Sequence, residues 1–106
     1  MYRWSEEKNE MLISQRGVSF SDVVYELENS GIIDNYKHPR EDKYPNQYIY
    51  VVRLKNYIHY IPYIEEDGYI FLKNIIPSRK LNKKYKGAWY GIFNTRGRII
   101  GSYRKW

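Results

Sequence analysis

The sequence predicts an α+β domain with two N-terminal helices, an antiparallel sheet of three to four strands, and a short basic helix after the sheet. Three observations lead to this prediction. Apolar residues recur at helical spacing before residue 31, strand-like runs follow between residues 47 and 76, and a lysine-rich stretch begins after Pro77. The 106 residues are enough for one domain and too few for two separate cores.

Two consecutive helices are expected at the N-terminal end. Ser5 is an N-cap candidate that precedes two glutamates, and Gly17 is placed to end the first helix. Residues 19–22, Ser-Phe-Ser-Asp, have the form of a capping box with Asp in place of Glu. We expect Gly31 to end the second helix, whose apolar stripe consists of Phe20, Val23, Val24 and Leu27.

Three long strands are expected over residues 47–54, 57–64 and 69–76, with turns at 55–56 and 65–68. Pro62 lies within the second run and indicates an edge strand or a bulge, because proline cannot donate to a strand ladder. Ile32 and Ile33 could open a further short strand. The polar residues 34–46 contain two prolines and predict an exposed loop.

The chain after the third strand divides into two parts. Residues 79 to about 86 are expected to form a very basic helix that completes a first domain, residues 1–86. Residues 87–106 form a basic C-terminal extension. Two alternatives are open for this extension, one more hairpin or a loosely ordered segment.

Charge is distributed unevenly along the chain. Residues 1–72 contain 8 Lys/Arg and all 12 Asp/Glu, which gives a net charge of −4. Residues 73–106 contain the other 10 Lys/Arg and no acid, which gives +10. Such a segment repels itself unless a polyanion or an acidic partner neutralises it. Nucleic acid is the commonest polyanion, and its binding gains from counterion release.

Composition excludes several classes of site. The absence of cysteine removes disulfides, a thiolate nucleophile and a thiolate zinc site. With only two histidines, the chain has few candidate residues for a histidine-rich metal site or a Ser-His-Asp triad. We therefore expect neither a metal nor a cofactor. The N-terminus lacks a signal-peptide profile and no run of 18 apolar residues occurs. We therefore expect a soluble cytoplasmic domain that does not contact membranes.

Three segments, in the same order, resemble the BrnT family of toxins. The first is residues 4–9, Trp-Ser-Glu-Glu-Lys-Asn, the second is residues 16–20, Arg-Gly-Val-Ser-Phe, and the third is residues 75–80, Ile-Ile-Pro-Ser-Arg-Lys. The likeness spans residues 1 to about 86. Three positions depart from the family pattern, because the family prefers Asp, His and Arg where this chain has Ser5, Arg16 and Lys80.

The resemblance implies a fold similar to that of RelE and ParE toxins and an activity as a translation-arresting endoribonuclease of a type II toxin–antitoxin system. It also implies neutralisation by a small antitoxin, usually a ribbon-helix-helix DNA-binding protein. The complex would then contact operator DNA only through the antitoxin. The extension over 87–106 has no counterpart in the family pattern.

The main catalytic candidates are Arg79 and Lys80. They follow a strand near the expected start of a helix, where backbone N–H groups and the helix dipole favour phosphate. We interpret them as contacts to the phosphate and the transition state of RNA cleavage. The alternative is a solvated charge cluster. Arg53, Lys73, Lys83 and Lys84 are further candidates for RNA binding.

Glu65 and His59 are the candidates for proton transfer. His59 titrates near neutrality in its ordinary state, although a strand histidine is more often structural. Glu65 could act as a base or pair with Arg79, although a hairpin-turn acid has the same sequence signature. His38, in the polar loop, is a weaker candidate than His59. The strand tyrosines could stack on bases or pack against the helices.

Two further functions remain compatible with the sequence. A non-catalytic nucleic-acid-binding module needs only the basic segment and the tyrosine-rich strands. An interaction protein could use its basic face for an acidic antitoxin and act on a target other than RNA.

Overall fold

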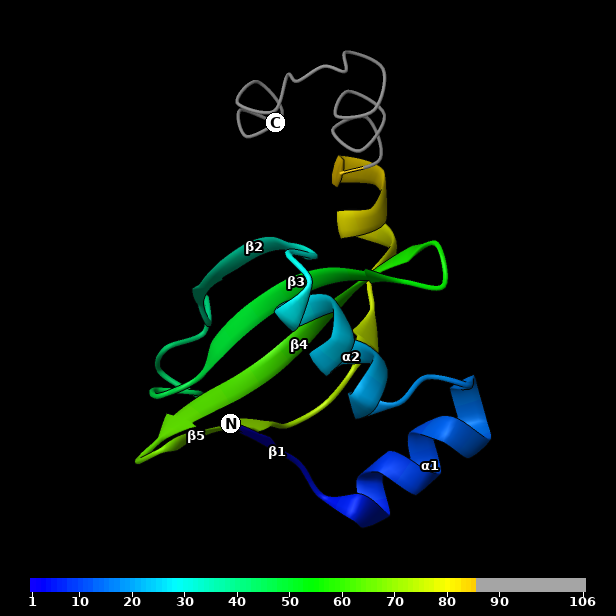
Figure 1. Cartoon of the computed structure of the whole chain (residues 1–106). Helices are drawn as coiled ribbons and strands as arrows, with labels where there is room; N and C mark the ends of the chain where they lie inside the picture. The colour runs from blue at the N-terminus through cyan, green and yellow to red at the C-terminus, as the bar shows by residue number, and fades with distance from the viewer. Residues whose placement is uncertain (86–106) are drawn as a thin grey trace.

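The computed structural model describes residues 1–85, so the alternatives for 87–106 lie outside the described residues. It confirms the α+β class, with two N-terminal helices, a mixed, mostly antiparallel sheet, and a short C-terminal helix packed on the sheet (Figure 1). The labelled elements are β1 (Tyr2–Arg3), α1 (Glu6–Arg16), α2 (Phe20–Glu28), β2 (Ile32–Lys37), β3 (Tyr48–Leu54), β4 (Tyr57–Glu66), β5 (Tyr69–Leu72) and β6 (Ile76–Pro77). We call residues 79–85 the C-terminal helix.

The helix boundaries follow the predicted capping chemistry. The Ser5 side chain accepts a hydrogen bond from the Lys8 N–H, and Gly17 ends α1 in the left-handed conformation at φ 70°. Both bonds of the predicted capping box between Ser19 and Asp22 are present at 3.1 Å. These bonds satisfy N–H groups that have no partner within the helix.

The end of α2 differs in one detail from the prediction. The left-handed residue after the helix is Ser30, at φ 62°, and not Gly31. The Gly31 N–H donates to the Glu26 carbonyl at 2.7 Å, and a Cβ on Gly31 would lie 2.9 Å from that oxygen. Position 31 therefore requires glycine, because a side chain there would collide with the backbone at the end of α2.

The sheet has the strand order β1-β5-β4-β3-β2, and β6 pairs with β4 beside β5. β1 was not predicted, and it pairs in parallel with β5. β2 was predicted only at Ile32 and Ile33, and it continues to Lys37 into the predicted loop. The predicted third strand is divided into β5 and β6 by residues 73–75. The prediction of an entirely antiparallel sheet is therefore corrected, because β1 and β5 form one short parallel pair at the edge of the sheet.

Pro62 lies in an interior strand, and the register of β4 with β3 is continuous around it. The predictions of an edge strand and of a bulge were both wrong. The Pro62 carbonyl accepts from the Lys73 N–H at 2.8 Å, which places the proline nitrogen on that same side of β4. That is where the chain leaves the ladder between β5 and β6, so the missing N–H interrupts no regular pairing.

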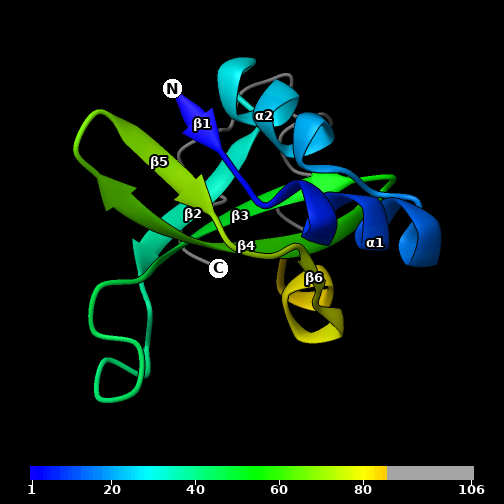
Figure 2. The ribbon, with the colours of Figure 1, turned by 90° about the horizontal axis from the view of Figure 1, so that it is seen from below.

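The sheet carries a hydrophobic cluster on each face. On the first face, Leu12, Phe20, Val23 and Leu27 from the helices pack on Val52, Ile61 and Leu72 of the sheet. On the second face, Ile49, Val51 and Ile58 pack against Tyr85, with Leu81 and Tyr60 at the margin. Figure 2 shows α1 and α2 on one side of the sheet and the C-terminal helix on the other. No helix within residues 1–85 is long and apolar enough to cross a membrane.

Candidate nucleic-acid interface

The C-terminal helix is attached to the sheet by side chains of its own sequence. The Ser78 hydroxyl accepts from the Leu81 N–H at 3.1 Å and caps the helix start. Ile58 at the start of β4 is bonded twice, because its carbonyl accepts from the Ser78 N–H at 3.0 Å and its N–H donates to Asn82 Oδ1 at 3.1 Å. The Tyr85 hydroxyl donates to Asp34 Oδ2 at 2.8 Å. These bonds hold the helix against β4 and β2.

Helical spacing then sorts the basic residues into two rows. Leu81 and Tyr85 face the sheet. Residues four apart share one side of a helix, so Lys80 and Lys84 flank the apolar row on one side. Arg79 and Lys83 are also four apart and are exposed to solvent. The four cations therefore form two pairs of different orientation.

Two hollows on the second face of the sheet share two lining residues, and we call the two together the basic groove. Their volumes are about 440 Å³ and 300 Å³, and both are lined by His38 and Tyr60. Figure 2 shows the β2–β3 loop on the same side of the sheet as the C-terminal helix. The charged and aromatic lining consists of Lys73, Lys80, Lys84, His38, Tyr36, Tyr44 and Tyr60.

The electrostatics of the groove favour an anion. None of the described residues that line the two hollows is a carboxylate, whereas three are lysines. Burial raises the pKa of Tyr36, and the negative charge of nearby Asp34 raises it further. Its hydroxyl therefore stays protonated near neutral pH and remains a hydrogen-bond donor.

The structure brings part of the predicted site together. Lys73, Lys80 and Lys84 line the basic groove, although Lys73 is distant in the sequence from the other two. Arg53 is half-buried, and its pairing with Ile58 places it on the same face of the sheet. Arg79 and Lys83 are exposed but are not among the lining residues. Of the predicted main pair, only Lys80 reaches the groove.

His59 lies on the opposite face of the sheet. Its cross-strand neighbour is Val52 in the core beneath the helices, and its side chain is 6% exposed. Nδ1 donates to the Tyr57 carbonyl at 2.9 Å. Burial lowers the pKa of His59; the hydrogen bond to Tyr57 opposes this shift, and the charge of Arg16 adds to it. The structure therefore supports the structural alternative for this histidine and separates it from the lysines.

Glu65 is also separated from the lysines. It is exposed near the end of β4, where it pairs with Ile70 of β5. β6, which leads into the C-terminal helix, pairs with β4 at His59 and Tyr60. The intervening strand residues span roughly 16 Å at about 3.3 Å each. Glu65 and Arg79 are therefore at different ends of β4.

Sequence reasoning ranked His38 below His59 and did not single out Tyr36. Tyr36 lies in β2, which extends further than predicted, and His38 directly follows this strand, so both side chains line the groove. Residues 32–37, Ile-Ile-Asp-Asn-Tyr-Lys, have no regular apolar–polar alternation, so the sequence contains no periodic signal for the full length of this strand.

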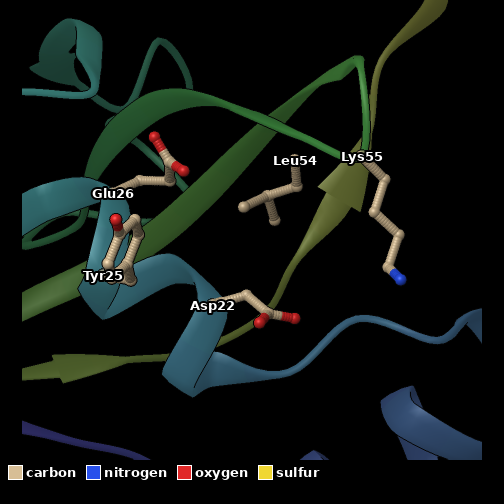
Figure 3. A pocket seen from close by; sticks show the side chains of 5 residues that line it. All are labelled: Asp22, Tyr25, Glu26, Leu54 and Lys55. Atoms are coloured by element: carbon tan, nitrogen blue, oxygen red, sulfur yellow. The ribbon is translucent and has the colours of Figure 1, made fainter.

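A third hollow, of about 230 Å³, lies between α2 and the end of β3 (Figure 3). It is lined by Asp22, Tyr25, Glu26, Leu54 and Lys55. Two carboxylates disfavour a polyanion here, and Asp22 already accepts the hydrogen bond that caps α2. This hollow does not share the electrostatic character of the basic groove.

Within residues 1–85, no group of three or more histidine and acidic side chains is placed to hold a metal ion. Comparison with models of protein families, with curated proteins and with solved structures finds no match to this chain.

Proposed function

We propose that this chain binds single-stranded RNA in the basic groove and cleaves it, as the toxin of a type II toxin–antitoxin pair. The observation that carries the proposal is the convergence of Lys73, Lys80 and Lys84 with aromatic rings along one groove whose described lining has no carboxylate. The likeness of three sequence segments to BrnT toxins supports the cleavage step and the antitoxin partner.

The proposed binding combines two physical contributions. Each lysine that neutralises a phosphate releases condensed counterions, which makes the affinity depend on salt. Aromatic rings such as Tyr60 offer surfaces for unpaired bases, and one stacked base contributes roughly 1–3 kcal/mol. Unpaired bases can reach these rings, whereas bases stacked inside a duplex cannot.

The proposed cleavage uses the 2′-hydroxyl of the RNA. Its oxygen forms a bond to phosphorus while the bond to the 5′-oxygen breaks. The 2′-hydroxyl loses its proton and the 5′-oxygen gains one, so the products carry a 2′,3′-cyclic phosphate and a 5′-hydroxyl. Lys80 and Lys84 would stabilise the charge that develops on the phosphorane oxygens.

A non-catalytic RNA-binding module is the second candidate. The placement of His59 and Glu65 away from the three lysines favours it, because neither group that sequence reasoning selected for proton transfer reaches the groove. Cleavage of a bound oligonucleotide separates the two candidates.

The first experiment compares two double variants on the same helix. Lys80→Gln/Lys84→Gln and Arg79→Gln/Lys83→Gln remove equal charge from exposed side chains, but only the first pair lines the groove. We expect the first variant to lose at least about tenfold in affinity for a fluorescent oligouridylate, and the second to lose several-fold less. Equal losses would show that general basicity, and not the groove, binds RNA.

Cleavage is measured on the same oligouridylate with chelator present, and the matching DNA is the control without a 2′-hydroxyl. We expect cyclic-phosphate ends from RNA and intact DNA. Binding without cleavage would establish the second candidate.

The toxin role is tested in cells by inducing the chain alone and mapping RNA 5′ ends. We expect growth arrest with new ends, and loss of both in the Lys80→Gln/Lys84→Gln variant. Arrest without new ends would point to a target other than RNA.

A further inference from the structure

His38 lies where the two hollows of the basic groove meet, since it lines both of them. Its backbone extends the β2–β3 ladder by one bond, from the His38 N–H to the Gln47 carbonyl at 2.9 Å. The start of the loop is thereby held to β3. His38 is the described histidine that shares a groove with the three lysines.

Two contacts orient the imidazole ring. The Arg40 N–H donates to Nδ1 at 3.0 Å, and the ring packs on Tyr44 with 4.4 Å between centroids and 35° between planes. The bond from Arg40 uses the Nδ1 lone pair, so the proton of the neutral ring is on Nε2. The ring nitrogen left for a ligand is therefore an N–H donor.

This arrangement does not suit proton transfer. A general base needs a lone pair on the nitrogen that meets the substrate, and here Nε2 carries hydrogen. Moving that hydrogen to Nδ1 would place two N–H donors, those of His38 and Arg40, against each other. A hydrogen-bond donor role retains both contacts that orient the ring.

We propose that His38 binds a phosphate oxygen of the RNA as a neutral hydrogen-bond donor through Nε2, between the cations of Lys73 and Lys80. The inference rests on the proposed function and names one recognition contact of that groove. The phosphate is the selected acceptor because the charged lining of the groove is cationic. The hydrogen bond from Nε2 is directional, and it supplements the attraction of the phosphate to the three flexible lysine side chains.

Glutamine and asparagine separate the two nitrogens of the ring. The amide of Gln places an N–H donor near the position of Nε2, whereas the amide of Asn places its oxygen near Nδ1, where it can accept from Arg40. We expect His38→Gln to bind oligouridylate within about threefold of the unmodified chain. His38→Ala and His38→Asn should bind about tenfold more weakly, as expected for one lost hydrogen bond to a charged group.

The experiment measures fluorescence anisotropy with labelled oligouridylate, and circular dichroism checks that each variant is folded. The same titration with an abasic ribose-phosphate oligomer tests which group of the RNA accepts the hydrogen bond. If His38→Ala also binds this oligomer more weakly than the unmodified chain does, the acceptor is the phosphate. If both proteins bind it equally well, His38 contacts the base and the proposal is overturned. Tight binding by His38→Asn together with weak binding by His38→Gln would assign the ring to anchoring the loop and overturn the proposal.

Two outcomes separate this inference from the proposed function. If His38→Ala binds normally but no longer cleaves, the donor role is overturned and His38 transfers a proton. If the unmodified chain does not bind oligouridylate at all, the proposed function fails and the inference fails with it.

Discussion

At the scale of single residues, the two histidines show how packing assigns chemistry. The sequence ranked His59 above His38 in the polar loop, although a histidine in a strand is more often structural. In the structure His59 is buried beside Val52 on the face that the helices cover and donates to Tyr57, whereas His38 lines the groove. The surroundings of the buried ring disfavour its charged form, and its place on the other face of the sheet separates it from the groove.

His59 leads to a prediction on the pH dependence of stability. In the unfolded chain it gains a proton near its ordinary pKa of 6.5, whereas in the folded chain the pKa is lower. Below 6.5 the unfolded state therefore binds more protons, so the free energy of unfolding falls as pH falls toward the folded pKa. Asn can keep the donor to the Tyr57 carbonyl without titrating.

We therefore expect a steeper loss of stability in the unmodified chain than in His59→Asn, measured by urea unfolding at several pH values between about 7.5 and 5. Parallel curves for the two proteins would show that His59 does not control this dependence.

At the scale of elements, the junction of α1 and α2 depends on one buried amide. Asn9 is 8% exposed, and its Oδ1 accepts from the Phe20 N–H at 2.8 Å. The bond joins the first turn of α1 to the first residue of α2. Removal of the acceptor leaves a buried N–H without this partner.

We expect Asn9→Ala to lower the free energy of unfolding by about 1–3 kcal/mol, measured by urea denaturation. Asn9→Asp is the matched control, because it keeps an oxygen at this position and places an acid at a helix N-terminus, where the dipole favours it. An unchanged stability of Asn9→Ala would contradict the assigned role of the bond.

The β3–β4 turn offers a stabilising change. Lys55 and Asn56 take φ values of 51° and 63°, the left-handed conformations of a two-residue type I′ turn. Such conformations disfavour most side chains, and Asn-Gly is the preferred pair. We expect Lys55→Asn/Asn56→Gly to raise the free energy of unfolding by about 1 kcal/mol, with a higher thermal midpoint as the readout. A lower midpoint would show that the native side chains stabilise this turn.

At the scale of the whole molecule, charge is divided between the two faces of the sheet. α1 and α2 together carry six acidic and two basic residues, and they cover the first face. The basic groove lies on the second face. A polyanion would therefore be attracted to the groove and repelled by the helices.

This separation predicts which lysines control the salt dependence of RNA binding. Each phosphate contact in single-stranded RNA contributes about 0.7 to the slope of log affinity against log salt. We expect Lys80→Gln to reduce the slope by about 0.7, and Lys8→Gln on α1 to leave it unchanged. Equal changes in the two variants would place the RNA elsewhere.

The local features of this fold were predictable because they depend on neighbouring residues. The Ser19–Asp22 capping box, the left-handed Gly17 and the Lys55-Asn56 turn were each recognised from residues within one turn of chain. For β2, the sequence predicted the first residues alone. The remaining residues of this strand are mostly polar, and they form a strand because they pair with β3. The same limit hid His38, which follows this strand.

The sequence by itself determined the α+β class, the two capped helices, the main hairpin and the concentration of positive charge after residue 72. These properties follow from local hydrogen bonding, side-chain periodicity and composition. The tertiary structure alone decided which side chains share a groove. Strand register and helix docking set the face on which each residue lies, and so they joined Lys73, Lys80 and Lys84 to His38 while placing His59 on the opposite face.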